Sequence, residues 1–380
     1  MNKKHDNLRT YDLVVVGGGF CGSIIGIKAH ELGLNVKVLD ATAHYPDNFR
    51  AEKLEDDQID ALASMDLMDL VRPTKSPPID RVHTFTGDVE TISKHQNHRG
   101  LHYQDTVNTL RGVLMDSGLL DIQRVSGIDD GPDFSQVLLN DGTALRARLV
   151  VITTGMEPAL RKSLNVVSHA TDELNSTTFG FDVEPDIDTN FRVRAFNARP
   201  PAFVSGLQYV TFFPVGDRTR ANLFTCWEQS NERVRKLKSK PSQELRDLFP
   251  ALDAHVGPLR VSSKVDTFST RYYRLDANHL LRTVLAGDAF QSVNPANGVG
   301  LSKCLTDAQT LLALLPELLK QGSSAVDLSA YYQDPRKRKV DHRALKRWRW
   351  VNELATSQSL RTKLKKLRFA AIARMMAILS

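Results

Sequence analysis

Residues 13–22 read Leu13-Val14-Val15-Val16-Gly17-Gly18-Gly19-Phe20-Cys21-Gly22, and they indicate the fold of this 380-residue chain. Four consecutive apolar residues that run into glycines are typical of a buried parallel strand. The segment Ser23–Leu32 is apolar enough for a buried helix, and Val36–Leu39 has the composition of a second strand that ends at Asp40. The pattern predicts a strand–turn–helix–strand unit, as at the start of a doubly wound α/β fold.

The glycines of this turn follow the spacing G-x-G-x-x-G. Such a turn lets the backbone approach a pyrophosphate, whose charge is stabilised by the amino end of the helix. Asp40 lies 21 residues after Gly19, where a carboxylate can accept hydrogen bonds from a ribose. We therefore predict a dinucleotide site formed by Gly17, Gly19, Phe20, Cys21, Gly22 and Asp40. The alternative is a glycine-rich turn that binds nothing.

A second glycine-containing segment, residues 287–302, reads Gly287-Asp288-Ala289-Phe290-Gln291-Ser292-Val293-Asn294-Pro295-Ala296-Asn297-Gly298-Val299-Gly300-Leu301-Ser302. It follows an expected strand at Leu280–Ala286 and precedes an expected helix from about Leu301 to Leu315, which contains Asp307. Together with the first motif, it resembles the flavoprotein monooxygenases of the para-hydroxybenzoate hydroxylase type (the group A flavoprotein monooxygenase superfamily). The resemblance covers about residues 10–330 and implies FAD as the cofactor.

This resemblance assigns roles within the second segment. Asp288 would accept hydrogen bonds from the ribityl hydroxyls, and the loop from Pro295 to Gly300 would approach the pyrimidine edge of the flavin. The helix that follows would direct its positive end toward the part of the flavin that becomes anionic on reduction. The residues expected at the reacting ring are Pro295, Gly298 and Gly300, and Gly287 and Val299 join them in holding the cofactor. The alternative for Asp288 is a buried carboxylate that caps the next helix.

Three more residues are assigned to the cofactor by the same resemblance. Arg50 lies in a segment similar to the family's R-x-x-x-L stretch and would contact the flavin diphosphate or its ribose, although an ordinary surface arginine is the alternative. Gln104 is the nearest substitute for a helix residue that supports the cofactor, because Tyr103 occupies the usual arginine position. Gly155 belongs to a middle motif near D-G-x-x-S-x-x-R.

The chain departs from the family pattern at several positions. In the middle motif, Thr154 replaces the aspartate and Pro158 the serine; in the second flavin motif, Gln291 replaces a frequent histidine and Ser302 a frequent asparagine. NAD(P)H is the expected electron donor, but these departures leave open whether it reduces the flavin directly. Since only one G-x-G-x-x-G occurs, the nicotinamide has no Rossmann domain of its own. The resemblance implies that it binds transiently at the surface of the flavin and substrate domains.

The predicted fold class is α/β, with a discontinuous Rossmann-like FAD-binding domain, an inserted mixed-sheet substrate domain and a C-terminal helical tail. We assign residues 1–75, 100–164 and 277–330 to the first domain, 76–99 and 165–276 to the second, and 331–380 to the tail. Alternating strand patterns support the inserted sheet: Phe179–Val183, Phe191–Phe196, Ala202–Thr211, Ala221–Trp227 and Val265–Phe268. Five aromatic residues could line a substrate pocket, but core packing is favoured for each: Phe212, Phe213, Trp227, Tyr272 and Tyr273.

The net charge of +6 is distributed unevenly. Residues 336–380 contain 14 lysines and arginines against two acids, a net charge of +12, so the rest of the chain carries −6. Asp334–Asn352 is expected to be helical, and Ser359–Leu379 has an apolar stripe surrounded by basic residues. Docking on the acidic body or on a second copy is favoured for this tail. A peripheral membrane helix is the next alternative, and no nucleic-acid partner is expected because basic helices alone are weak evidence.

The cysteines and the hydropathy of the chain indicate in which cellular compartment the protein is expected. Cys21, Cys226 and Cys304 are odd in number and far apart in sequence, which favours a reducing compartment over a disulfide framework. No stretch approaches the roughly 20 apolar residues that cross a bilayer. A cytoplasmic protein is expected, with peripheral membrane attachment as the variant, and no metal site is expected.

The leading functional hypothesis is an FAD-dependent monooxygenase, or hydroxylase. It would use NAD(P)H and O2, through a flavin C4a-hydroperoxide, on a small organic substrate that is aromatic or polyketide-like. This chemistry needs few protein acids because the cofactor carries it. Two alternatives stay open: a flavin-dependent reductase or dehydrogenase of the prenyl-reductase type acting on a lipid-like substrate, and a flavin-binding protein without turnover.

Overall fold

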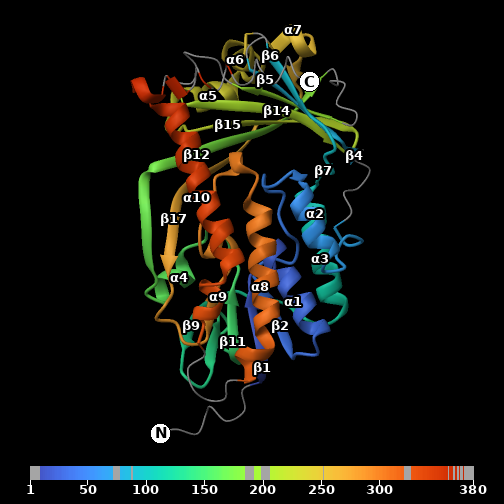
Figure 1. The fold of residues 1–380 in the computed structure, drawn as a ribbon. Coiled ribbons are helices and arrows are strands. Elements are labelled where there is room, and N and C mark those ends of the chain that lie inside the picture. Colours follow the sequence, from blue (N-terminus) through green and yellow to red (C-terminus); the bar gives the residue numbers. More distant parts are fainter. Residues whose placement is uncertain are drawn as a thin grey trace.

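Two sheets and the helices packed on them make up the protein (Figure 1). The computed structural model describes residues 9–71, 78–86, 89–184, 192–197, 206–250, 252–320 and 327–357, together with 359–362, 364, 365, 368 and 371. The strands of the first sheet come from residues 10–152 and 283–285, and those of the second from residues 81–93 and 167–276. The strands are therefore distributed as the sequence predicts, while the domain boundaries themselves remain a prediction.

The first sheet has seven strands, and the N-terminal strand lies at its centre. The strand order is β8-β2-β1-β11-β10-β9, and β18 pairs with β11. Its strands are β1 (Thr10–Val16), β2 (Val36–Asp40), β8 (Leu120–Ile122), β9 (Val125–Asp130), β10 (Ser135–Leu139), β11 (Ala144–Ile152) and β18 (Thr283–Leu285). The pairs β1–β2, β1–β11, β2–β8 and β11–β18 are parallel, so the apolar run of β1 is buried on both faces as expected.

The helices of this half lie against that sheet and each other. They are α1 (Phe20–Glu31), α2 (Asp56–Ala63), α3 (Tyr103–Asp116), α4 (Ala159–Ser163), α8 (Gly300–Lys320) and α9 (Ser329–Tyr332). Helix α1 contacts both α3 and α8, which brings the two glycine motifs to one edge of the sheet. The predicted strand–turn–helix–strand unit is confirmed, with the helix beginning three residues earlier than expected, at Phe20.

The second sheet has eight strands in the order β16-β12-β15-β14-β13-β5-β6, with β17 paired to β12. The strands are β5 (Arg81–Thr86), β6 (Val89–Ser93), β12 (Val167–Glu184), β13 (Arg192–Asn197), β14 (Leu207–Val215), β15 (Arg218–Thr225), β16 (Arg260–Val261) and β17 (Asp266–Asp276). Three helices cover one face of this sheet: α5 (Glu232–Ser239), α6 (Pro241–Leu248) and α7 (Leu252–Val256). The small sheet of β3 (Lys53–Leu54), β7 (His98–Gly100) and β4 (Pro78–Ile79) lies between the halves (Figure 1).

Several expected strands differ in length from the observed ones, and the expected strand Phe179–Val183 is part of the much longer β12 (Val167–Glu184). Of the expected strand Leu280–Ala286, only Thr283–Leu285 forms a strand, β18, which pairs with β11. The expected strand Val265–Phe268 continues to Asp276, because β17 pairs with β12 along its whole length. This extension places Tyr272 and Tyr273 within a strand. The segments 191 and 202–205 of two other predicted strands lie outside the described residues.

The basic tail begins with a helix docked on the body. Helix α10 (Pro335–Thr356) runs beside α8 toward the second sheet (Figure 1). Its Trp348 is fully buried and lies edge-on to Tyr272, with ring centroids 5.8 Å apart. The expected helix is therefore confirmed and is docked on the body, whereas the alternatives weighed for Ser359–Leu379 remain predictions. Of the apolar stripe beyond it, Leu360 and Leu364 are exposed, and Leu367, Met375 and Ile378 lie outside the described residues.

Gly22 allows the closest backbone approach in the first motif. A Cβ at this position would lie 1.9 Å from the Gly17 carbonyl oxygen and 2.4 Å from Thr153 Oγ1. We predict that Gly22→Ala strongly lowers the free energy of unfolding, because α1 must move away from the end of β1. Gly112→Ala in α3 is the control: its Cβ would meet nothing within 4 Å, so a gain of roughly 0.5–1 kcal/mol is expected. Urea unfolding of both variants measures the difference, and equal stabilities would contradict it.

Candidate functional site

One cavity lies between the second glycine motif, the segment 49–58 and the second sheet. It contains about 1200 Å³ of unfilled space continuous with solvent. One wall comes from the first half of the protein: Phe49, Arg50, Ala51, Glu52, Lys53, Glu55, Gln58, Tyr103, Asp288, Val293, Pro295, Ala296, Asn297, Gly298, Gly300, Leu301 and Cys304. The opposite wall comes from the second sheet: Thr178, Tyr209, Thr211, Phe213, Asn222, Phe224 and Phe268. Arg347 of α10 completes the lining.

The first motif is held together by Asp40 and Arg111. The Gly18 backbone N–H donates to Asp40 Oδ2 at 2.7 Å. The buried Arg111 guanidinium donates to the Gly18 carbonyl at 3.2 Å and lies 3.4 Å from Asp40 Oδ1. Sequence reasoning missed Arg111; the signal was an arginine on the apolar face of the 103–116 helix, beside Val107, Leu110 and Leu114.

Phe20 and Cys21 lie in the first turn of α1 and are both buried. The Phe20 ring lies 6.1 Å from that of Tyr103, and Cys21 Sγ approaches the Cys304 carbonyl at 3.7 Å. A Cβ on Gly19, in contrast, would have its nearest neighbour at 4.0 Å, a ring carbon of Tyr45. The turn is therefore closed toward the protein at Gly22 and open at Gly19, as a turn that receives a pyrophosphate requires.

The end of β11 lies beside this turn. Thr153 Oγ1 donates to the Gly17 carbonyl at 2.8 Å. Gly155 has a positive φ of 64°, a conformation that glycine adopts readily. Thr154 Oγ1 is buried and has no hydrogen-bond partner in the part of the chain that the structure describes. The middle motif therefore presents an unpaired hydroxyl where the family pattern has an aspartate.

In the second motif, the Gly287 N–H donates to Asp307 Oδ2 at 2.7 Å. This bond fixes the turn that carries Asp288 to the wall of the cavity. Burial raises the pKa of Asp288, and nearby Lys303 and Arg50 oppose that rise. The Asp288 carboxylate accepts no hydrogen bond from another described residue, so it is available to a hydroxyl-bearing ligand; its backbone carbonyl accepts one from the Tyr273 hydroxyl.

The loop that follows reaches the cavity with its backbone. Gly298 has a φ of 68°, and a Cβ there would lie 3.0 Å from Glu55 Oε1. Its carbonyl accepts a hydrogen bond from Gln58 Nε2 at 2.9 Å, while the Tyr209 hydroxyl donates to the Ala296 carbonyl at 2.6 Å. Pro295, Gly298 and Gly300 all line the cavity, as predicted. Val299 instead directs its side chain into a small cluster with Val293 and Ala344.

The remaining predicted cofactor residues divide into one at the cavity and one away from it. Arg50 lines the cavity, with its guanidinium 4.4 Å from the centroid of the Phe268 ring. Gln104 donates to the Tyr45 carbonyl at 3.2 Å and is not part of the cavity wall, where Tyr103 stands in its place. The first turn of α3 turns residue 103 toward Phe20, and the assignment of Gln104 to the cofactor remains a prediction.

These features fit FAD. The open glycine turn and the unpaired Thr154 hydroxyl suit the diphosphate, the unpaired Asp288 suits the ribityl chain, and the Pro295–Gly300 loop suits the ring. No group of three or more histidine, cysteine or acidic residues with metal-binding geometry occurs among the described residues. The cavity is therefore a candidate for an organic cofactor and an organic substrate together.

The substrate wall alternates along each strand. In β14, Thr211 and Phe213 line the cavity, whereas Phe212 is buried with α5–α7 on the other face. Trp227 also packs in that core, and Tyr272 packs on Trp348. Core packing is thus confirmed for Phe212, Trp227 and Tyr272, while Phe213 is both buried and part of the cavity wall.

Glu52, another acid in this wall, has a raised pKa. Burial raises its pKa to about 7, although Arg220 opposes the rise. Arg220 Nε lies 2.9 Å from both Glu52 oxygens, and the same guanidinium contacts Asp182 and Asp266 at 3.3 Å. Burial is the main cause of the raised pKa of Glu52, and the two neighbouring carboxylates, Asp182 and Asp266, add to it.

The comparisons with known proteins agree with this site. The family described as FAD binding domain matches residues 10–344, and the chain belongs to that family. Para-nitrophenol 4-monooxygenase of Pseudomonas sp. (strain WBC-3) is 36% identical over 83 residues, and the match spans only about a fifth (21%) of the length of each protein. The family match establishes an FAD-binding fold for this chain, with FAD as its cofactor.

Solved structures share the fold over nearly the whole chain. The p-nitrophenol 4-monooxygenase PnpA from Pseudomonas putida DLL-E4 has a TM-score of 0.76 at 19% identity, over 97% of this chain and 94% of that one. PqsL of P. aeruginosa, solved with 2-aminobenzoylacetate, has a TM-score of 0.72 at 17% identity, over 91% and 98%. At these identities the likeness concerns the fold alone.

We predict that Asp288→Ala lowers the affinity for FAD by ten- to about a hundredfold. A hydrogen bond to a charged group contributes about 1.5–3 kcal/mol, and each 1.4 kcal/mol is tenfold. Titration of the apoprotein with FAD, followed by flavin fluorescence, measures the change. Asp217→Ala, in the exposed β14–β15 turn, is the control and should bind as the unaltered protein does. Equal affinities for both variants would exclude this role.

We also predict that Glu52 makes stability fall as pH rises. The folded protein keeps a proton that the unfolded chain loses, between the ordinary pKa of 4.5 and about 7, so the free energy of unfolding decreases across that window. Glu52→Gln removes this contribution, and the decrease should become smaller. Urea unfolding from about pH 5 to about pH 8 tests this, with the exposed Glu317→Gln as control. An unchanged slope in Glu52→Gln would contradict the assignment.

Proposed function

We propose that this protein is an FAD-dependent monooxygenase that hydroxylates an aromatic small molecule, with NAD(P)H as electron donor. The observation that carries the proposal is the shared cavity. Its one wall holds the residues that suit the flavin, and its other wall presents Tyr209, Phe213, Phe224 and Phe268. Aromatic side chains give a planar substrate large apolar contact and ring–ring packing. Both nitrophenol monooxygenases above, similar in part of the sequence or in fold, support this choice.

The protein's own residues would bind, orient and shield. Gly17, Gly19 and the amino end of α1 would hold the diphosphate, Asp288 the ribityl hydroxyls, and the Pro295–Gly300 backbone the ring edge. Arg50 and Gly155 would flank the same cofactor. When bound and reduced, FAD supplies the activation of O2. The apolar wall would exclude water, and two buried polar atoms without described partners, Thr178 Oγ1 and Asn297 Oδ1, would orient a substrate hydroxyl or amine.

Several finer assignments belong to this proposal. The described helices include none long and apolar enough to cross a membrane, and the three cysteines are free, which supports a cytoplasmic location. The exposed Leu360 and Leu364 beside basic residues suit a second copy or an anionic membrane surface. The prenyl-reductase alternative and the flavin carrier are less favoured, because the match in sequence is to a monooxygenase, although one structure of similar fold is described as geranylgeranyl bacteriochlorophyll reductase-like.

The reaction type is tested with the purified yellow holoenzyme. Phenols, anilines and isoprenoids are supplied with NADH or NADPH, and we expect consumption of the nicotinamide to be coupled to an aromatic product carrying one atom from ¹⁸O2. Mass spectrometry of the product and oxygen uptake are the measurements. Double-bond reduction without oxygen uptake would select the reductase alternative, and flavin reduction without any product would select the carrier.

A further inference from the structure

A cation from the C-terminal helix reaches the candidate substrate cavity. Arg347 of α10 lines it together with Tyr209 and Asn297. Within the described ranges, Arg347 forms no ion pair with a carboxylate. Carboxylates are scarce near it in sequence, because residues 336–380 contain 14 basic residues and only two acids, and both acids are paired with lysines. The side chain is therefore a positive charge at the cavity that the protein itself does not neutralise.

The other basic side chains that line the cavity have partners within the protein. Lys53 pairs with Glu55 at 3.1 Å, and Glu52 is bound by Arg220. Arg50 lies over the Phe268 ring and acts on the pKa of Asp288, on the side assigned to the flavin. Arg347 thus remains as the cation available to a ligand on the substrate side of the Pro295–Gly300 loop.

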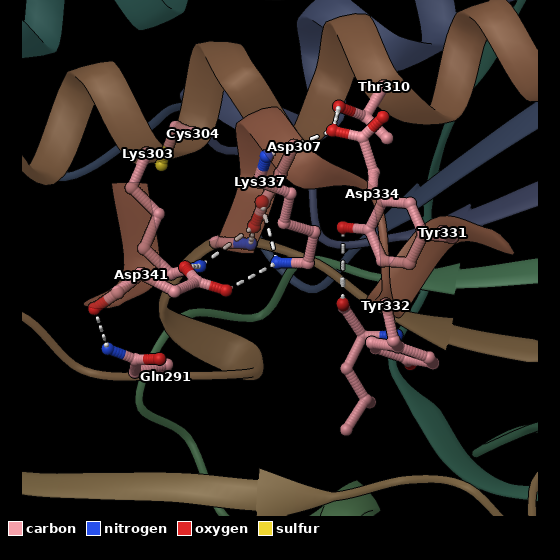
Figure 2. A network of polar contacts seen from close by, with 12 residues as sticks. Gln291, Lys303, Cys304, Asp307, Thr310, Tyr331, Tyr332, Asp334, Lys337 and Asp341 are labelled. Carbon is pink, nitrogen blue, oxygen red and sulfur yellow. Dashed lines mark hydrogen bonds and ion pairs between the residues drawn. The ribbon is translucent and has the colours of Figure 1, made fainter. Parts of the chain in front are cut away.

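Four buried charges fix α10 in its place (Figure 2). Lys303 and Asp307 of α8 face Lys337 and Asp341 of α10, and each lysine contacts both aspartates. The Nζ–Oδ distances are 3.1 Å for Lys303–Asp307, 2.6 Å for Lys303–Asp341, 2.7 Å for Lys337–Asp307 and 3.2 Å for Lys337–Asp341. Buried pairs of this kind allow little displacement, since a separated charge would be left without solvent or partner.

The segment that carries Arg347 is anchored at both sides. Asn297 Nδ2, in the flavin loop, donates to the Ala344 carbonyl at 3.2 Å, three residues before Arg347. Trp348, the next residue, is fully buried against Tyr272. A helix held at residues 341, 344 and 348 presents residue 347 in a defined direction, so the fold sets the point from which the Arg347 side chain extends toward the cavity.

We propose that Arg347 binds the carboxylate of the substrate, and that the enzyme therefore selects aromatic acids over their neutral analogues. The inference rests on the proposed function, because it concerns the same cavity. A guanidinium offers two parallel N–H donors that match a carboxylate, and the aromatic wall of Tyr209, Phe224 and Phe268 receives the ring. The strongly basic tail thereby contributes one residue to substrate recognition.

The test compares aryl acids with their primary amides, which have nearly the same shape without the charge. The pairs are 2-aminobenzoate, 4-hydroxyphenylacetate and 4-hydroxycinnamate, each with its amide. Binding to the holoenzyme is followed by the change in the visible spectrum of the bound flavin. We expect at least one acid to bind about tenfold or more tightly than its amide, as expected for a charge-assisted hydrogen bond. If every amide binds as tightly as its acid, the inference is overturned.

Variants assign the preference to this residue. Arg347→Met should abolish the preference for the acid and raise KM for it about tenfold with kcat nearly unchanged, whereas Arg347→Lys should retain part of it. Arg343→Met, an exposed arginine one turn earlier that does not line the cavity, is the matched control and should behave as the unaltered enzyme. A preference that survives in Arg347→Met would place the anion elsewhere.

The two proposals fail in different ways. If acids bind through Arg347 but no atom from ¹⁸O2 enters a product, the reaction type is wrong and the binding inference stands. If labelled oxygen enters neutral phenols as readily as acids, and Arg347→Met has no effect on either, the inference is wrong and the reaction type stands.

Discussion

The burial of Lys303, Asp307, Lys337 and Asp341 between two helices constrains much of this structure. Four charges removed from water are stable only when each is paired, and the ring of contacts pairs every one of them. Asp307 also accepts the Gly287 N–H, so the same group that holds α10 to α8 shapes the turn before Asp288. The C-terminal helix and the second glycine motif are therefore one structural unit, although residues 303–334 separate them in the sequence.

The cavity arises from the alternation of side chains in the second sheet. Residues on one face of β14 and β15 pack under α5–α7 and supply the core, and their neighbours on the other face meet the flavin loops. Because the second sheet joins the first through the long strands β12 and β17 (Figure 1), the cavity forms where the two halves meet. The residues proposed to hold the flavin and those proposed to bind the substrate thus line the same cavity.

The uneven charge of the chain acquires a structural meaning in α10. Asp341 of this helix is paired with the buried Lys303 and Lys337. Most of the other basic residues of α10 face solvent. Arg347 is also exposed, but it differs from them because it lines the cavity. A net charge computed for the whole protein would describe neither the buried ring nor this single cation.

The sequence by itself determined the FAD-binding half. An apolar run that ends in G-x-G-x-x-G predicts a buried strand followed by a tight turn. The spacing to Asp40 and the second motif indicated the family. These signals are local, so they survive without knowledge of contacts. Tertiary structure decided the rest. It placed Tyr103, and not its neighbour Gln104, in the wall of the cavity, and it placed Arg111 against the first glycine turn. It also put Phe213, and not Phe212, in the substrate wall and brought Arg347 to the same cavity. Each depends on which face of a helix or strand meets a distant segment, and that is set by packing between elements far apart in the chain.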